Sequence, residues 1–395
     1  MKNKTFKLVI LFLLITLFSF SISFFLNLGP DKLQAYFSTF KFKSDFTDEI
    51  PVSLKNYDLL NEDEKLAYIA VFDKIKDHPE YIKIPTLSSE EFNNVFYAVK
   101  NDNPDILCFA DSCNMITYLS ASFLQLDYAY DVKSCEIMTA EMNKVADSIV
   151  KETDGMSDFE KELYIHDRLV SDCTYSETKN SSTAYGCLVE NKAVCSGYSR
   201  AAMLLLLKSG IDSMVVAGTG VTPSEGEISH MWNIVWLDNE SYHLDVTWDD
   251  PVSDSGDVLS HLYFNLKDNE ISSDHKNFHI DFTCDSDRYN YFVFNNLYFE
   301  SYDDNVLDLI SKNLCDNINS GKYYLEFEFS DSSVYESAYD SLINNLSPGS
   351  HIYVIIDYLS KNSNNTADLT HVNFSEDASR NYLRIVFDTI GNEVV

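Results

Sequence analysis

The chain has 395 residues, which is long enough for two or three domains that each bury a core. Hydrophobic residues make up 45% of it, including 25 Tyr and 26 Phe, so we expect it to fold despite a formal net charge of -33. The 62 acidic residues outnumber the 29 basic ones, which argues against a nucleic-acid partner because its phosphates would be repelled.

The first thirty residues predict a membrane segment. Three lysines among the first seven residues precede an uncharged apolar run from Leu8 to about Leu28, which Gly29-Pro30 closes. A helix of about 20 such residues spans a bilayer core of roughly 30 Å. The positive-inside rule places the lysines inside and the rest of the chain outside. We therefore expect a single-pass anchor in the cell membrane over residues 1–30 with an extracellular body, or a secreted protein if the segment is a cleaved signal peptide.

Residues 31–134 are predicted to form an N-terminal accessory region without chemistry of its own. The apolar spacing indicates helices over Asn61–Lys76 and Ser88–Val99, and the Tyr- and Leu-rich segments after them are typical of strands. Ser88 and Glu91 have the spacing of a capping box at a helix start.

Two further helices, over about Ile137–Glu152 and Asp158–Asp172, open a predicted catalytic region at 135–285. The second helix contains His166. A single histidine on a packed helix is more often structural than catalytic, so we assign it no role in chemistry.

Cys195 stands at the predicted start of the next helix. The residues from Ser199 to Lys208 are rich in Ala and Leu, and they favour a helix that ends at Gly210. Unpaired N–H groups and the positive end of the helix dipole favour an anion there, which raises the thiolate fraction of a cysteine. Cys195 is therefore a candidate nucleophile that needs a base nearby.

A predicted strand over Ser213–Val221 follows this helix, and two further predicted strands come after it, joined to each other by a tight turn. The strands cover Ile228–Leu237 and Ser241–Trp248, and the Asp238-Asn239 pair between them is typical of a two-residue hairpin turn. With that turn, Leu237 pairs with Glu240 and fixes the register of both strands.

This register brings a histidine and an aspartate together. His230 and Asp245 then point to one face as diagonal neighbours, with their backbones roughly 7 Å apart. A three-residue turn would place them on opposite faces. His243 shares the face of Asp245 and is the alternative base.

Residues 286–395 are predicted to form a small α/β accessory domain, and no motif in it indicates chemistry. Its strands are expected over Tyr291–Phe299, Tyr323–Phe329 and Tyr382–Phe387, and its helices near 303–318 and 332–346.

The eight cysteines have no C-x-x-C spacing of a zinc or redox site. In an oxidising compartment Cys108 and Cys113 are the closest candidates for a disulfide, and the spacing leaves the connectivity open. No cluster of metal ligands at recurring spacing is visible, so we expect neither a metal nor a cofactor.

Three motifs in this order resemble the transglutaminase-like core of bacterial extracellular proteins. They are the run from Tyr185-Gly186 to Cys195-Ser196-Gly197-Tyr198, His230-Met231-Trp232-Asn233, and Asp245-Val246-Thr247-Trp248-Asp249. The resemblance covers about residues 135–285. It implies an α+β fold with a papain-like core, in which a helix bears Cys195 and an antiparallel sheet bears His230 and Asp245.

The same resemblance implies a Cys-His-Asp triad that forms a thioester with an amide carbonyl. Transfer of the thioester to water would give hydrolysis, and transfer to an amine would give transamidation of protein glutamine. We expect an amide or peptide bond hydrolase that acts on a protein or peptide. A substrate of the cell surface or cell wall is one candidate. The further alternative is a non-catalytic binding module on the same fold. No pattern indicates the oligomeric state.

The residue before the nucleophile departs from the family pattern. Val194 stands where animal transglutaminases have Gln before the catalytic Cys. This leaves the backbone N–H of Cys195 as the expected oxyanion donor, with Tyr185 as a side-chain candidate.

Overall fold

The computed structural model describes residues 55–107, 109–118, 121–250, 259–344, 349–364 and 366–389. The predicted membrane segment at 8–28 lies outside these residues. Within them, no helix combines the length and the apolar character needed to cross a bilayer. The chain divides into two compact units, one formed by Met1–Leu259 with Ser272–Thr283 and the other by Ser260–Ile271 with Cys284–Val395.

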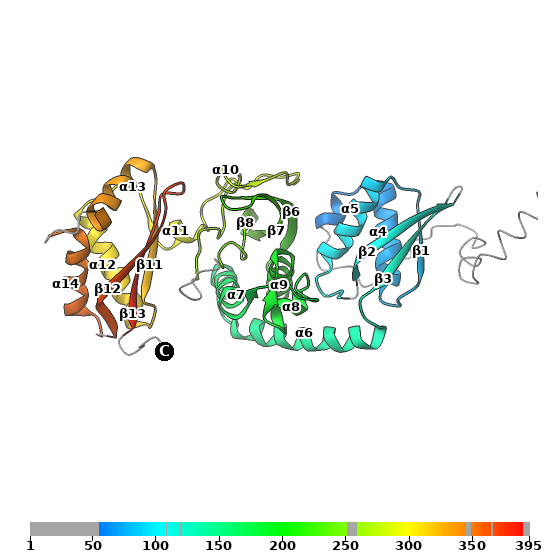
Figure 1. Ribbon diagram of the computed structural model, residues 1–395, viewed down its shortest axis with the longest axis horizontal. Helices are drawn as coiled ribbons and strands as arrows, with labels where there is room; N and C mark the ends of the chain where they lie inside the picture. Colours follow the sequence, from blue (N-terminus) through cyan, green and yellow to red (C-terminus); the bar gives the residue numbers. More distant parts are fainter. Residues whose placement is uncertain are drawn as a thin grey trace, which may run out of the picture. The chain divides into compact units, whose positions relative to one another are not determined.

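The first unit begins with helices on a three-stranded antiparallel sheet. Its elements are α3 (Lys55–Asp58), α4 (Glu62–Ile75), β1 (Tyr81–Ile84), α5 (Ser89–Asp102), β2 (Phe109–Tyr118) and β3 (Ala121–Tyr128). In the sheet, β3 lies between β1 and β2. Figure 1 shows α4 and α5 on one face of this sheet, where apolar side chains of both helices form a core with β1 and β3.

Side chains at the helix starts explain where α4 and α5 begin. The hydroxyl of Ser88 accepts from the N–H of Glu91, and the carboxylate of Glu91 accepts from the N–H of Ser88 at 2.7 Å. Asn61 and Glu64 form the same reciprocal pair before α4. The capping box predicted at Ser88 is confirmed, and each pair satisfies N–H groups that a helix start leaves without partners.

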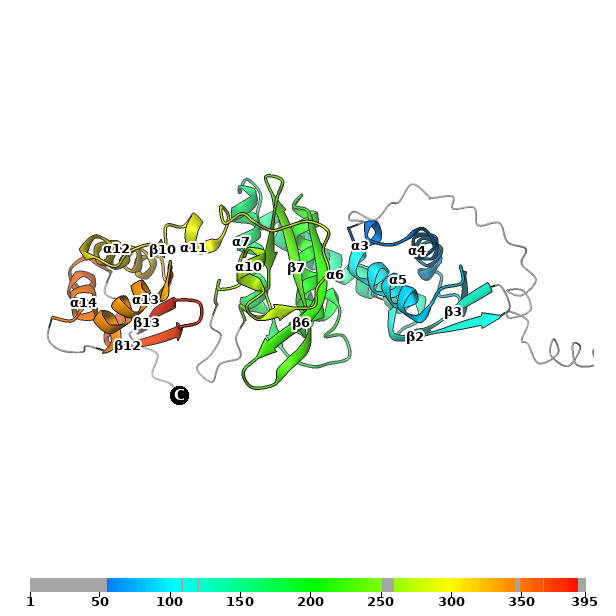
Figure 2. The same cartoon turned by 90° about the horizontal axis from the view of Figure 1, so that it is seen from above.

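The second part of this unit packs helices against a four-stranded antiparallel sheet. Its elements are α6 (Val132–Glu152), α7 (Asp158–Asp172), β4 (Thr174–Tyr175), α8 (Ala184–Leu188), β5 (Lys192–Ala193), α9 (Cys195–Lys208), β6 (Ser213–Thr222), β7 (Gly226–Leu237), β8 (Glu240–Leu244) and β9 (His275–Lys276). The strand order is β8-β7-β6-β9, and Figure 2 shows β6 and β7 side by side in a long hairpin.

Helix α9 packs on β6 and β7, and Asn233 of β7 ties it to the sheet. The side-chain amide of Asn233 donates to the carbonyl oxygen of Ser199 on α9 at 2.9 Å. A buried amide needs such partners, since leaving it unpaired would cost about 1–3 kcal/mol. The helix that begins at Cys195 is thereby held on the antiparallel sheet.

The turn between β7 and β8 has the predicted two-residue form. Asp238 and Asn239 have φ angles of 50° and 66°, the left-handed values that a type I′ turn requires. Leu237 pairs with Glu240, as this turn predicts.

Strand β8 is shorter than the predicted strand Ser241–Trp248. It ends at Leu244, because Asp245 accepts hydrogen bonds from the backbone N–H groups of Thr247 at 3.0 Å and Trp248 at 3.2 Å. These bonds fold the chain into a turn and remove it from the strand ladder. Asp245 therefore lies just after the strand instead of within it.

The second unit contains a four-stranded sheet with helices. Its elements are α10 (Asp268–Ile271), α11 (Tyr291–Phe294), β10 (Tyr298–Phe299), α12 (Asp304–Asn319), β11 (Tyr324–Phe329), α13 (Ser332–Tyr339), the π-helix η1 (Asp340–Asn344), α14 (His351–Asn362), β12 (Ala367–Asp377) and β13 (Tyr382–Thr389). The strand order is β10-β11-β13-β12, with β10 parallel to β11 and the other pairs antiparallel. Strands β11 and β13 confirm the predictions at 323–329 and 382–387.

The strand predicted over Tyr291–Phe299 is wrong for its first half. This half forms α11, because the side chain of Asn290 accepts from the N–H groups of Phe292 at 3.0 Å and Val293 at 3.2 Å and caps a helix. Only Tyr298 and Phe299 form a strand.

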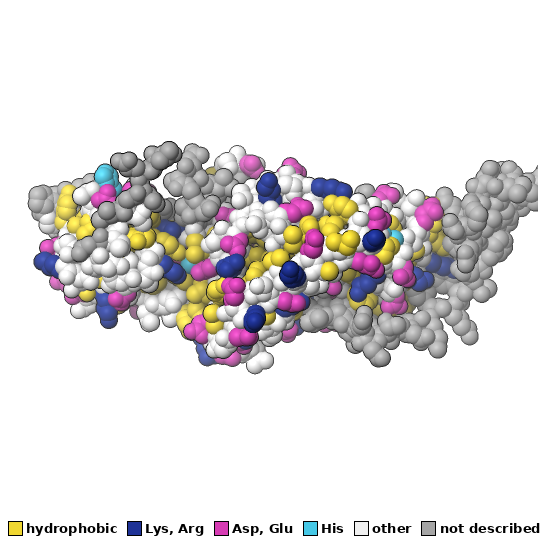
Figure 3. Space-filling model, turned by 90° about the horizontal axis from the view of Figure 1, so that it is seen from below, with side chains coloured by type: hydrophobic (Ala, Val, Ile, Leu, Met, Phe, Trp, Pro, Cys, Tyr) yellow, Lys and Arg dark blue, Asp and Glu magenta, His cyan; other side chains and the backbone are white. Residues whose placement is uncertain are grey.

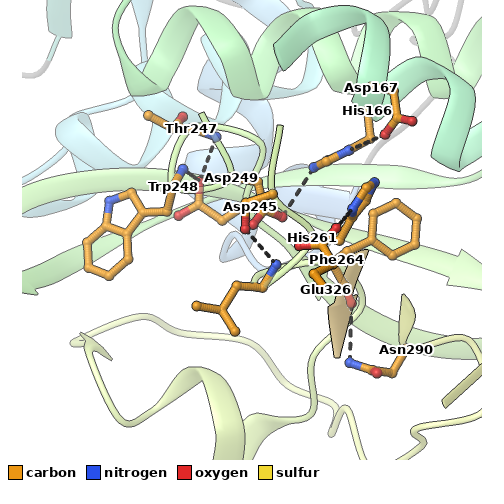
Figure 4. Close-up of polar contacts among 12 residues, drawn as sticks. His166, Asp167, Asp245, Thr247, Trp248, Asp249, His261, Phe264, Asn290 and Glu326 are labelled. Carbon is orange, nitrogen blue, oxygen red and sulfur yellow. Dashed lines mark hydrogen bonds and ion pairs between the residues drawn. The ribbon is translucent and has the colours of Figure 1, made fainter. Parts of the chain in front are cut away.

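Polar contacts hold the segment Ser260–Ile271 within the second unit. His261 Nδ1 lies 2.5 Å from Glu326 Oε1, and both side chains are buried. The side-chain amide of Asn290 donates to the carbonyl oxygen of Phe264 at 3.4 Å (Figure 4). The segment is thereby tied to residues that follow it by up to 65 positions.

Charged side chains of both signs are interspersed on the face drawn in Figure 3, with apolar side chains between them.

Among the cysteines, Cys135 is disulfide-bonded, whereas the thiol of Cys113 is free. The pairing of Cys113 that its spacing suggested is therefore wrong.

Candidate active site

Cys195 is the first residue of α9, as predicted. Val194 precedes it with an extended backbone, and no side chain caps the helix start. The first N–H groups of the helix can therefore stabilise negative charge at the thiol or on a bound oxygen. Cys195 is half-buried, whereas Cys173 and Cys187 are buried.

Close backbone packing fixes the start of α9. The N–H of Val194 donates to the carbonyl oxygen of Ser181 at 3.0 Å. Gly197 packs against the same carbonyl, and a Cβ added there would lie only 2.1 Å from the oxygen. A larger residue would push the helix away, which explains the glycine of the Cys195-Ser196-Gly197 motif.

His230 and Asp245 are in contact inside the protein. His230 Nε2 lies 2.5 Å from Asp245 Oδ2, and their side chains are only 2% and 0% exposed. Because Asp245 engages Nε2, Nδ1 is the nitrogen that is available to the thiol of Cys195. His230 also interacts with Cys195, so the structure brings together the three residues that the sequence predicted.

Both oxygens of Asp245 are used. Oδ2 lies 2.5 Å from His230 Nε2 and 2.9 Å from Nε2 of His275. Oδ1 accepts from the N–H groups of Thr247 at 3.0 Å and Trp248 at 3.2 Å (Figure 4). Four hydrogen bonds therefore fix the orientation of one buried carboxylate.

Burial and charge oppose one another in this pair. Burial alone would lower the pKa of His230, but the charge and hydrogen bond of Asp245, together with Cys195, raise the pKa to about 10. Burial would raise the pKa of Asp245, but the charge and hydrogen bond of His230 and the contact with His275 hold it well below its usual range. An imidazolium beside a carboxylate is the state that these shifts favour near neutral pH.

Two further aspartates of the same turn hold rings on neighbouring helices. Asp249 Oδ2 lies 3.2 Å from Nε2 of His166 on α7, whose Nδ1 lies 3.0 Å from Asp167 (Figure 4). Tyr198 on α9 donates to Asp250 Oδ2 at 2.5 Å. The turn that carries Asp245 is thereby anchored to α7 and α9, and no sequence pattern indicated these contacts.

Residues 143–246 match the family model of the transglutaminase-like superfamily. This part of the chain belongs to that superfamily. The match includes Cys195, His230 and Asp245. No match was found among curated proteins.

Three solved structures are similar to the chain at low identity. A protein named as a TGase is 14% identical, with a TM-score of 0.24 over 43% of this chain and 51% of that one, so the chain spans about half of its length. A candidate cysteine protease from Cytophaga hutchinsonii is 12% identical, with a TM-score of 0.26 over 45% of this chain and 76% of that one. A candidate protease from Parabacteroides distasonis ATCC 8503 is 12% identical, with a TM-score of 0.21 over 34% and 35%.

The alternative side chains have other partners within the transglutaminase-like domain. His243 is completely buried in β8, where its Nδ1 accepts from Nε1 of Trp232 at 3.0 Å. Tyr185 lies on α8, and its hydroxyl donates to Glu141 at 3.0 Å. Neither contact involves a residue of the predicted triad.

His275 is a neighbour of His230 and Asp245 that sequence reasoning missed. Its ligand atom lies with those of His230 and Asp245 within 4.8 Å of one another, and all three residues are buried. Two imidazoles and a carboxylate form a donor set that zinc accepts. These atoms already bond to one another, so a metal ion would have to replace their hydrogen bonds.

Aromatic packing covers the imidazole of His230. The ring centroid of Trp248 lies 5.2 Å from that of His230. Gly220 on β6 leaves room for both rings, since an added Cβ would lie 2.8 Å from Trp248 Cζ2 and 3.3 Å from the Cβ of His230. Strand β6 thus shapes the transglutaminase-like site because Gly220 has no side chain.

Tyr175 is an exposed aromatic residue close to Cys195. It pairs with Ala193, two residues before Cys195, and its side chain is 44% exposed. Partial burial, and next the charge of Cys195, raise the pKa of its phenol. This placement makes Tyr175 a candidate for contact with a substrate. The sequence alone did not indicate such a role.

Proposed function

We propose that the transglutaminase-like domain is a cysteine-dependent hydrolase of amide or peptide bonds. Cys195 is the nucleophile, His230 the base and Asp245 the residue that orients the base. The observation that supports this most directly is the buried 2.5 Å contact between His230 Nε2 and Asp245 Oδ2, in a domain whose cysteine begins a helix.

In this proposal the proton of the Cys195 thiol has already passed to Nδ1 of His230, which forms the imidazolium, and the thiolate bonds to the carbonyl carbon of the substrate. The C–N bond breaks as His230 returns the proton to the leaving amine. An acyl thioester remains on Cys195. Water adds to it while losing a proton to His230, and the C–S bond then breaks to release a carboxylic acid and restore the thiol.

Backbone N–H groups at the start of α9 are the proposed oxyanion donors. Val194 offers no side-chain donor, and no side chain caps this helix start. The N–H of Cys195 is therefore assigned to the oxygen of the tetrahedral intermediate. Tyr185 is not assigned to it, because its hydroxyl donates to Glu141.

Hydrolysis is proposed over transamidation because water at about 55 M competes for the thioester unless a dry channel excludes it. Of the three tryptophans that could form such a channel, Trp232 is buried and packs on His243. Trp236 packs on Phe282 at a ring distance of 5.2 Å. These two have packing roles, which leaves Trp248 as the aromatic wall beside His230.

We further propose that the domain acts outside the cytoplasm on a protein or peptide of the cell surface or cell wall. The apolar run of residues 8–28 behind three lysines supports this location. The disulfide of Cys135 fits an oxidising compartment.

Site-resolved labelling tests the proposed nucleophile. Cys173 and Cys187 are matched controls, because they line a cavity of about 550 Å³ between α6, α7 and α8 that includes none of the triad. A mild thiol-reactive probe at neutral pH should label Cys195 much faster than either control. Equal labelling of the three thiols would contradict the proposal.

The reaction is tested with denatured casein, which offers both glutamines and peptide bonds, and a labelled primary amine. We expect new peptide ends or released ammonia that disappear in Cys195→Ala and persist in Cys173→Ala. Rapid amine incorporation without cleavage, lost in Cys195→Ala, would replace the hydrolase by a transamidase and keep the triad. Binding of casein without any turnover would favour the binding module.

A further inference from the structure

A second histidine shares the oxygen of Asp245 that His230 uses. Nε2 of His275 lies 2.9 Å from Asp245 Oδ2, and its Nδ1 lies 2.7 Å from Oδ1 of Asp274. The His275 side chain is 0% exposed. A completely buried imidazole therefore joins two carboxylates, one of which belongs to the proposed triad.

The sheet fixes the position of this ring. Strand β9 pairs with β6 so that His275 lies opposite Gly220. The imidazole centroid lies 4.3 Å from the ring of Trp248 and 4.8 Å from that of Trp232. The backbone and two indoles thus hold the imidazole independently of its contact with Asp245.

We propose that His275 is a positioning residue, whose Nε2–H holds the carboxylate of Asp245 in the orientation that His230 needs. The inference rests on the proposed function of Cys195, His230 and Asp245. A carboxylate only accepts hydrogen bonds, so the proton of this contact is assigned to Nε2 of His275. His275 acts through Asp245 and does not itself touch the reacting atoms.

The physical reason is preorganisation. Without the bond from His275, the buried Asp245 keeps one imidazole partner and two backbone partners, and its Oδ2 can move relative to His230. An error of about 1 Å in such a group can lower a rate by about 100-fold. The imidazolium would then stabilise the thiolate of Cys195 less well.

The test uses two substitutions of the same residue in the full chain. His275→Phe keeps a ring between the two indoles and removes the N–H group. His275→Gln keeps an amide N–H of similar reach, so it should rescue the contact with Asp245. If His275→Phe does not fold, His275→Asn replaces it, because its amide is too short to reach Asp245.

The measured quantity is the alkylation rate of Cys195 by iodoacetamide at about pH 6, with Cys113, whose pKa burial raises to about 11, as the slow-reacting background in the same sample. Circular dichroism confirms the fold of each variant. We expect a loss of roughly 10- to 100-fold at Cys195 in His275→Phe, recovery to within about 3-fold in His275→Gln, and no change at Cys113. An unchanged rate at Cys195 in folded His275→Phe would overturn the inference.

A double-mutant cycle separates positioning from general packing. If His275 acts through Asp245, His275→Phe should add no further loss in an Asp245→Asn chain. Losses that add, or an equal loss in His275→Phe and His275→Gln, would show a structural role only and overturn the inference.

The proposed function fails separately from this inference. If Cys195→Ala keeps full turnover of casein, the triad itself is wrong. If Asp245→Asn slows alkylation of Cys195 and His275→Phe does not, the triad stands and only the role of His275 is wrong.

Discussion

The charge of His230 and the hydrogen bonds of both histidines together outweigh burial at Asp245. A buried carboxylate without partners would become neutral or destabilise the fold, but this one has two imidazoles and two backbone N–H groups as neighbours. The result is a pKa well below the usual range of an aspartate. Asp245 therefore contributes to the stability of the domain as well as to the proposed chemistry.

The stabilising effect of the pair should depend on pH. The folded pKa of His230 is raised to about 10, so its contribution is complete below the unfolded value of about 6.5 and is lost as the pH rises through 10. That of Asp245 is lowered, so its contribution is complete above about pH 4 and is lost as the pH falls through the folded pKa.

The difference in unfolding free energy between the native chain and Asp245→Asn should therefore be larger at about pH 6 than at about pH 10. Urea unfolding at the two pH values measures this difference. Asp281→Asn, at an exposed position, is the control and should show no such change. An equal difference for Asp245→Asn at both pH values would mean that its contact with His230 does not shift the histidine.

The contacts of Asp245 also show how far the sequence predicts the site. His230 and Asp245 could be placed together, because a two-residue hairpin turn fixes the register of the strands that lead to them. His275 could not, because it lies 30 residues beyond Asp245 and reaches it only when β9 pairs with β6. No local pattern specifies that pairing.

Strand β6 supports the site through its glycines. Besides Gly220, Gly218 lies where an added Cβ would be 2.7 Å from the ring of Trp232. The strand therefore accepts bulky rings from β7 across its surface. A small residue here is a packing requirement, since the neighbours are indoles that have little freedom to move.

Gly220→Ala should disturb the site from this strand. The new methyl group would overlap Trp248 and press on His230, so we expect the unfolding free energy to fall by about 1–3 kcal/mol and alkylation of Cys195 to slow. Urea unfolding and the alkylation assay measure the two effects. Ala217→Ser, at an exposed position of the same strand, should change neither. An unaltered site in Gly220→Ala would show that Trp248 can shift without consequence.

Both strands that the sequence misplaced have one physical cause. Asp245 ends β8 before the predicted end of the strand, and Asn290 starts α11 where a strand was predicted. Each side chain does so by accepting from backbone N–H groups two and three residues further along. Such local bonds compete with the ladder of a strand. A prediction from hydrophobic spacing depends on the apolar side chains and ignores these polar hydrogen bonds. It therefore extends a strand through residues whose backbone leaves the sheet.

For the whole molecule, the lysines ahead of the apolar run at 8–28 predict which side of the membrane the units occupy. Protease added to intact producing cells should cleave the chain after residue 30, while a cytoplasmic marker remains whole. Survival of the chain in cells whose known surface proteins are cut would reverse the proposed topology.

The interleaving of the two units has a consequence for synthesis. The ribosome delivers Ser260–Ile271 before Glu326 and Asn290, which hold this segment in the second unit. Strand β9, which completes the sheet of the first unit, comes next after Ser260–Ile271 and also before Asn290 and Glu326. A nascent chain can therefore assemble Cys195, His230, Asp245 and His275 while an apolar stretch just ahead of β9 still waits for residues not yet made. Until those residues emerge, that stretch is exposed to chaperones and to aggregation.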